Sequence, residues 1–156
     1  MKKHIILNLL FLIIISSCSK YQKVLKSNDL TYKYEQALLY YNNKDFKRAL
    51  PLFSELHQIM IGTANMQSIS YYFAYCNYAT GDNLMAAYLF EQYVKNFPNH
   101  KHTEECSYMT AYCYYLETPN YSLDPTNNYK AIKKLQEHIN KYPNSKRTKE
   151  CNILIY

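Results

Sequence analysis

The chain has 156 residues and a formal net charge of +6. The positive charge is almost all lysine and is scattered, without a basic stripe among exposed aromatics, which argues against a nucleic-acid partner. Its two glycines, Gly62 and Gly81, are too few for a loop that cradles phosphates or a dinucleotide.

The N-terminus has the pattern of a secretory signal, with two lysines followed by an apolar run over residues 5–15. A membrane-spanning helix needs about 20 residues, whereas a signal core needs only about 7–15. The Ile-Ser-Ser-Cys sequence at 15–18 resembles the lipobox of bacterial lipoproteins, where diacylglycerol is attached before signal peptidase II cuts. We predict a signal peptide over 1–17 and a lipid anchor, palmitate included, on Cys18. The alternatives are an ordinary secretory signal and an uncleaved anchor.

Residues 18–28 are polar and predict a lipidated flexible tether, followed by a repeat domain over 29–156. A shift of 37 residues superimposes many side-chain types in the first two thirds of the chain, and a shift of 45 does so later. The eight extra residues belong to a loop that contains Pro119 and Pro125. The predicted units are 29–64, 65–99, 100–144 and a partial unit, 145–156.

Each unit contains two stretches with apolar residues at helical spacing. The expected helices are 29–42, 46–61, 67–80, 84–97, 102–116, 126–142 and 145–156. Asp45 is expected to cap the second helix, and Pro51 to bend it or remove a hydrogen bond. No alternating strand pattern occurs. The predicted fold class is all-α, a right-handed solenoid of about three helix-turn-helix repeats plus a partial fourth.

The units resemble tetratricopeptide repeats. The matching residues are a small side chain in the first helix, a Gly-Asp turn, an Ala and a Phe in the second helix, and a closing proline, as in Ala74, Gly81-Asp82, Ala86, Phe90 and Pro98. The usual Trp and the Leu-Gly pair are absent.

Four cysteines besides Cys18 occupy equivalent positions in successive units: Cys76 with Cys113, and Cys106 with Cys151. Stacked helices lie about 8–10 Å apart, whereas the Cα atoms of a disulfide lie within about 7 Å. We expect small buried side chains rather than disulfides.

Tyrosines recur on one face of the first helix of each unit, three or four residues apart. In tetratricopeptide proteins this face lines the concave surface, so the tyrosines predict an aromatic groove suited to an extended peptide. The alternative is that some rings pack between helices. The predicted groove residues are Tyr34, Tyr41, Tyr71, Tyr75, Tyr78, Tyr108, Tyr112 and Tyr115.

Signatures of catalysis are missing from the sequence, so we predict no enzymatic activity and no cofactor. One cluster, His100, His102, Glu104 and Glu105, has the residue types of a metal site. We interpret it instead as a polar helix start, with acids near the positive end of the helix dipole. His57 and His138 have no evident partner in the sequence.

A lipobox followed by these repeats resembles the BamD family of lipoproteins in the outer-membrane β-barrel assembly (Bam) machine. The closest stretch is 124–145, where a loop leads into an Ala-Ile helix that ends in Tyr-Pro-Asn-Ser. Phe97-Pro98-Asn99 has the same ending one unit earlier. The family usually has about five repeats, whereas this chain reaches the first helix of a fourth. That difference predicts either a shortened member or an end that a partner covers.

The resemblance implies a non-enzymatic lipoprotein on the periplasmic face of the outer membrane. Its expected partners are a BamA-like barrel subunit and unfolded outer-membrane protein precursors, which the family recognises through an aromatic-ending C-terminal signal. Ser19, which follows the lipidated cysteine, favours sorting to the outer membrane. The alternative function is a generic tetratricopeptide lipoprotein that organises other envelope proteins.

Overall fold

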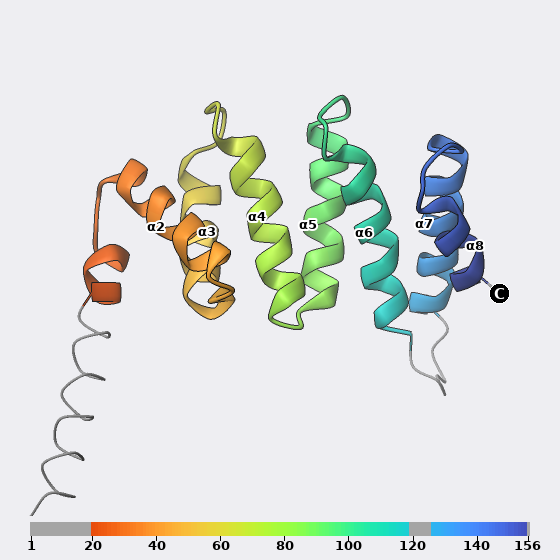
Figure 1. Ribbon diagram of the computed structural model, residues 1–156, viewed down its shortest axis with the longest axis horizontal. Coiled ribbons are helices and arrows are strands. Elements are labelled where there is room, and N and C mark those ends of the chain that lie inside the picture. The colour runs from red at the N-terminus through yellow and green to blue at the C-terminus, as the bar shows by residue number, and fades with distance from the viewer. Residues whose placement is uncertain (1–19, 119–125, 156) are drawn as a thin grey trace, which may run out of the picture. The chain divides into compact units, whose positions relative to one another are not determined.

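The computed structural model describes residues 20–118 and 126–155 (Figure 1). In these residues all regular secondary structure is helical. The chain forms two compact units, the first ending at Leu56 and the second beginning at His57. Helices follow one another as helix-turn-helix pairs, which confirms the predicted all-α repeat solenoid.

The first unit contains a short helix over residues 20–25, α2 (Leu30–Asn42) and most of α3 (Phe46–Ile59). The carboxylate of Asp45 accepts a hydrogen bond from the backbone N–H of Arg48 at 3.3 Å, so the predicted cap is confirmed. α3 runs without interruption through Pro51, which is exposed.

The segment before α2 differs from the flexible tether that we expected. Val24 is only 2% exposed, and the Tyr21 hydroxyl donates to the carbonyl oxygen of Arg48 at 3.1 Å. The buried Lys33 ammonium donates to the carbonyl oxygen of Leu25 at 3.1 Å and pairs with Glu55 at 2.5 Å. The polar composition of the segment did not reveal that Val24 is buried or that Lys33 binds the backbone of the segment. The predicted signal peptide and Cys18 lie outside the described residues.

The second unit contains five described helices, each packed against the next. They are α4 (Met66–Ala79), α5 (Asn83–Asn96), α6 (Thr103–Leu116), α7 (Thr126–Lys141) and α8 (Thr148–Ile155). Figure 1 shows α4, α5, α6 and α7 standing side by side. Fully buried Ala74, Ala86 and Ala111 allow close approach of the helices, and Phe90 and Leu135 fill the space between them.

The turn inside a repeat has the same geometry in both units. Gly81 has φ 89°, and Lys44, which the 37-residue shift places at the same position, has φ 60°. The next residue donates its N–H to a carbonyl five residues back, from Asp82 to Asn77 at 3.0 Å and from Asp45 to Tyr40 at 2.9 Å. A left-handed residue therefore ends the first helix, as in a Schellman motif.

The helix boundaries agree with the sequence prediction to within three residues. The largest difference is at α8, which begins at Thr148 because Ser145 is part of a loop. Its hydroxyl donates to Glu104 at 2.7 Å and accepts from the N–H of Arg147 at 3.1 Å. Among the described residues, no helix has the length and apolarity needed to cross a membrane.

Candidate peptide-binding surface

Six of the predicted groove residues lie in the second unit, on α4 and α6, the first helices of successive repeats. We call this set the tyrosine strip: Tyr71, Tyr75, Tyr78, Tyr108, Tyr112 and Tyr115.

The rings of the tyrosine strip are in contact along α4 and across to α6. The ring centroids of Tyr71 and Tyr75 are 4.8 Å apart, and those of Tyr75 and Tyr78 are 6.5 Å apart. Tyr78 then lies 6.4 Å from Tyr112 on the next repeat. The ring of Phe90 on α5 packs edge-on against the ring of Tyr75, with the ring centroids 4.9 Å apart. The rings therefore form one aromatic row across two repeats.

On α6 the rings are stacked. Tyr112 lies 5.7 Å from Tyr108 with planes 15° apart, and 6.3 Å from Tyr115 with planes 21° apart. Accessibility increases along this helix, because Tyr108 is 5% exposed and Tyr115 is 37% exposed. Tyr112 and the three tyrosines of α4 are half-buried. Most of the tyrosine strip therefore presents ring surface that a ligand can cover.

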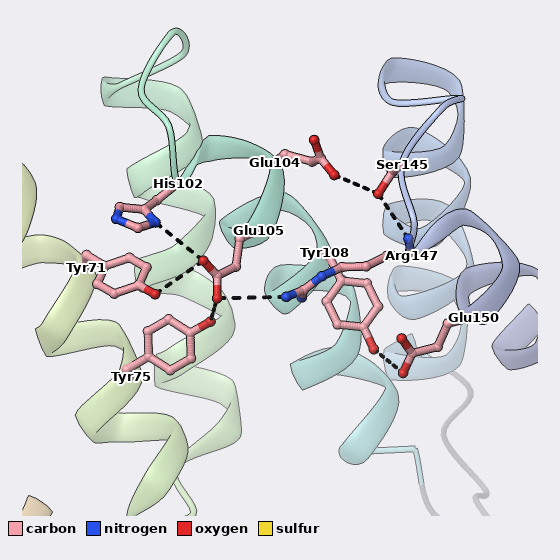
Figure 2. Close-up of polar contacts among 9 residues, drawn as sticks. All are labelled: Tyr71, Tyr75, His102, Glu104, Glu105, Tyr108, Ser145, Arg147 and Glu150. Atoms are coloured by element: carbon pink, nitrogen blue, oxygen red, sulfur yellow. Dashed lines mark hydrogen bonds and ion pairs between the residues drawn. The ribbon is translucent and has the colours of Figure 1, made fainter. Parts of the chain in front are cut away.

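Glu105 organises the part of the tyrosine strip on α4 (Figure 2). Its carboxylate accepts hydrogen bonds from the hydroxyls of Tyr71 at 3.2 Å and Tyr75 at 2.5 Å. The imidazole of His102 lies 3.4 Å from this carboxylate and stacks on the Tyr71 ring at 4.3 Å. The Arg147 guanidinium lies 3.8 Å from the same carboxylate. One acid thus ties two tyrosines of one repeat to the next repeat.

The same arrangement recurs one repeat later. The Tyr108 hydroxyl donates to Glu150 at 2.6 Å, and the guanidinium of Arg147 lies 4.5 Å from the centre of the Tyr108 ring (Figure 2). The 37-residue shift relates Tyr71 to Tyr108, and the 45-residue shift relates Glu105 to Glu150 and His102 to Arg147.

Burial and the neighbouring carboxylates keep these phenols protonated. Desolvation raises the pKa of Tyr75, and its hydrogen bond with Glu105 raises it further. Desolvation, followed by the hydrogen bond with Glu150, likewise raises the pKa of Tyr108. The hydroxyl protons are therefore directed at the acids, and the hydroxyl oxygens remain able to accept hydrogen bonds.

The remaining groove candidates, Tyr34 and Tyr41, lie in the first unit on α2. Their rings are 6.5 Å and 6.4 Å from that of the buried Phe53, and Tyr41 is also 5.4 Å from Phe46. Both are half-buried. Their membership in one groove with the tyrosine strip stays a prediction.

Sequence reasoning missed the acids and cations that hold the tyrosines. Glu105 was interpreted only as an acid near a helix start, and it does lie in the first turn of α6. A usable signal was present, because Glu105 and Glu150 are equivalent under the same shift that relates Cys106 to Cys151. Tertiary pairing of that acid with a tyrosine 34 or 30 residues earlier is not visible in local spacing.

The histidines have partners that the sequence did not suggest. His138 is fully buried, with its Nδ1 atom 3.2 Å from the hydroxyl of Ser107, while its Nε2 atom has no hydrogen-bond partner in the described residues. The ring of His57 packs on Phe73 at 5.3 Å. Nδ1 of His100 lies 2.5 Å from the Tyr93 hydroxyl. Within the described ranges, His, Cys, Asp and Glu form no group of three arranged to hold a metal.

The four cysteines of the repeat domain are free thiols, and each is fully buried. This confirms that they serve as small buried side chains. Desolvation raises the pKa of Cys76 and of Cys113 to about 12. These thiols are therefore poor nucleophiles near neutral pH.

Comparison with known proteins places the chain in a family. No curated protein matches the sequence. The model of the YfiO family, described as outer membrane lipoprotein, matches residues 26–155, which is most of the chain and extends over parts of both units of the fold. The chain therefore belongs to the YfiO family of outer membrane lipoproteins.

Proposed function

We propose that this protein is a BamD-like, non-enzymatic scaffold that binds unfolded outer-membrane protein precursors along the tyrosine strip. It is held at the periplasmic face of the outer membrane by a lipid on Cys18, and it acts with a BamA-like barrel subunit. Family membership supports the membrane and the lipoprotein character. The lipobox at residues 15–18 supports the anchor.

The observation that carries the proposal is the unbroken contact of six tyrosine rings across two repeats. Such a surface suits an extended, aromatic-rich peptide, because rigid rings bury apolar area at a low entropic cost.

Binding of a peptide that ends in Phe to the full chain, purified in detergent, tests this proposal. We expect Tyr75→Ala combined with Tyr112→Ala to weaken binding about tenfold or more, because each lost aromatic contact is worth about 0.5–1.5 kcal/mol. Tyr88→Ala is the matched control, since Tyr88 lies on α5 outside the tyrosine strip and is 54% exposed. Unchanged binding by a folded double variant would show that the tyrosine strip is not the peptide-binding surface.

Affinity capture with the full chain separates the two scaffold functions. Recovery of a BamA-like barrel subunit supports assembly of outer-membrane proteins, whereas recovery of cell-wall enzymes without it supports the generic envelope scaffold. Cys18→Ser should release the protein from the membrane fraction and remove the lipid mass from its N-terminal peptide.

A further inference from the structure

Two cavities lie at equivalent loops of the second unit, each after the second helix of a repeat. The first follows α5, has a volume of about 290 Å³, and is lined by no lysine, arginine or carboxylate. The second follows α7 and has a volume of about 570 Å³. We call the second one the cationic cavity, and its charged lining residues are Lys141, Lys146, Arg147 and Glu104. The same loop therefore carries a strongly charged lining in only one of these two repeats.

At the first cavity, neighbouring polar groups satisfy one another. The hydroxyl of the buried Tyr93 lies 2.5 Å from Nδ1 of His100, which lines that cavity. The 45-residue shift relates Tyr93 to His138 and His100 to Ser145. These equivalents form no such bond, because the hydroxyl of Ser145 donates instead to Glu104 at 2.7 Å (Figure 2). The internal hydrogen bond of the first loop is thus missing from the second.

Two buried polar atoms beside the cationic cavity have no hydrogen-bond partner among the described residues. They are Nε2 of His138 and the hydroxyl oxygen of Tyr142. His138 is fully buried, and its ring centroid lies 5.2 Å from that of Tyr142, which lines the cavity. At the first cavity the equivalent of Tyr142 is Phe97, which has no hydroxyl. Because buried polar groups are nearly always hydrogen-bonded, these two atoms favour a polar occupant of the cationic cavity.

The cations of the cationic cavity have capacity for a ligand. Lys141 and Lys146 are exposed and form no ion pair with any residue that the structure describes. The ammonium of Lys141 lies 5.4 Å from the centre of the Tyr142 ring, which places its charge at the wall with the unpartnered hydroxyl. Arg147 lies 3.8 Å from Glu105, but its guanidinium has more N–H donors than one such contact uses. The excess positive charge attracts an anion.

These donors suit a phosphate group better than a carboxylate. A phosphate monoester carries about 1.5–2 negative charges near neutral pH and offers several strong acceptor oxygens. Lysine ammonium groups bind phosphate as point charges, and an arginine guanidinium binds two of its oxygens side by side. A cavity with several cations on one loop can therefore contact one phosphate group from more than one side.

We propose that the cationic cavity binds a phosphate group, held by Lys141, Lys146 and Arg147. Free phosphate and the headgroup of a phosphomonoester lipid share this chemistry, and the experiment below distinguishes them. The inference goes beyond the proposed function, because it requires neither the tyrosine strip nor a bound peptide.

Titration of inorganic phosphate into the full chain, labelled with ¹⁵N and purified in non-ionic detergent, tests the site. We expect the backbone amide signals of Lys146 and Arg147 to shift with a Kd of about 1 mM at low salt, as a few partly exposed ion pairs provide. The shifts should decrease at about 1 M sodium chloride. Adding phosphatidic acid or phosphatidylcholine to the detergent micelles identifies the source. Shifts at lower concentration with phosphatidic acid than with phosphate would support a lipid headgroup, and equal concentrations would support free phosphate.

Lys141→Ala combined with Lys146→Ala should weaken phosphate binding about tenfold, because two partly exposed ion pairs are lost. Lys101→Ala is the matched control, since Lys101 corresponds to Lys146 under the 45-residue shift and does not line the first cavity. It should leave binding unchanged.

Tyr142→Phe tests the unpartnered hydroxyl separately from the charges. Because this hydroxyl has no hydrogen-bond partner among the described residues, we expect Tyr142→Phe to leave the thermal stability undiminished without phosphate. The same variant should weaken phosphate binding about threefold.

Absence of shifts at Lys146 and Arg147 with both phosphate and phosphatidic acid would overturn the site. Unchanged binding by the folded Lys141→Ala and Lys146→Ala double variant would also overturn it, because the anion would then bind elsewhere. Equal shifts with acetate at the same ionic strength, or with phosphatidylcholine alone, would overturn the assignment to phosphate. None of these outcomes bears on the proposed function, which peptide binding to the tyrosine strip tests separately.

Discussion

The two junctions between repeats in the second unit have the same frame and different chemistry. At the first junction, where α6 follows α5, Glu105 accepts two tyrosine hydroxyls and its neighbour is His102. At the second junction, where α8 follows α7, Glu150 accepts the hydroxyl of Tyr108, over whose ring Arg147 lies. The repeat thus determines where side chains meet, while substitutions at those places determine the charge and the hydrogen bonds of each junction.

The cores of the two junctions test whether the frame is as similar as the equivalence implies. Phe90 and Leu135 occupy equivalent positions and are both fully buried. We expect Phe90→Ala to cost about 3–5 kcal/mol and Leu135→Ala about 2–5 kcal/mol of unfolding free energy, measured by urea denaturation. A cost below about 1 kcal/mol for Leu135→Ala would mean that the second junction lacks a packed core.

Substitution of Glu105 and Glu150 tests whether the two junctions differ in their hydrogen bonding. Glu105→Ala removes the acceptor of the Tyr71 and Tyr75 hydroxyls, and Glu150→Ala removes the acceptor of the Tyr108 hydroxyl. Because a hydrogen bond to a charged group contributes about 1.5–3 kcal/mol, and less when partly exposed, we expect about 2 kcal/mol for Glu105→Ala and about 1 kcal/mol for Glu150→Ala. Urea denaturation measures both. Equal costs would break the proposed asymmetry.

Much of the frame could be predicted from the sequence, because helical spacing, the Gly81-Asp82 turn and the two shifts are local or periodic signals. The tyrosine faces of α4 and α6 were likewise predictable. The Glu105 pairings were not, since they join residues on different repeats and depend on rotamers that spacing does not fix. The docking of residues 20–25 was also missed, because it depends on tertiary contacts of Tyr21, Val24 and the buried Lys33 that spacing does not reveal.

Acid should weaken the second junction through His138. Burial is the main cause that lowers the pKa of His138; Arg147 also lowers it, and Glu104 opposes the shift. As the pH falls, the unfolded chain therefore binds a proton at this histidine before the folded chain does. The contribution of His138 to the free energy of unfolding is fully present above about pH 6.5 and is lost progressively below it.

His138→Gln, which cannot titrate, should lose less stability than the unaltered protein between neutral and acidic pH, as thermal denaturation at several pH values would show. His100→Gln is the parallel test at the first junction, where burial, followed by His102 and Lys101, also lowers the pKa of His100, so this variant should likewise lose less stability in acid. An unchanged pH dependence in His138→Gln would remove His138 from this account.

Thiol labelling measures the opening of each junction without altering it. Cys106 and Cys151 are equivalent and fully buried, but Cys151 lies on α8, which has eight residues and packs against α7. We expect Cys151 to react faster than Cys106 with a thiol reagent in the native protein, because α8 can detach with less loss of buried area. Peptide mass spectrometry reports the two rates. Equal rates would show that the junctions open as one.

The docked segment at residues 20–25 changes how force would enter the molecule. A flexible coil at the N-terminus would extend under tension before any force reached the folded unit. Here a pull on this segment is carried through Tyr21 to the backbone of Arg48 and through the Leu25 carbonyl to Lys33 and Glu55. A force applied at the N-terminal end would therefore act on α2 and α3 together, because the segment is attached to both helices of the first unit.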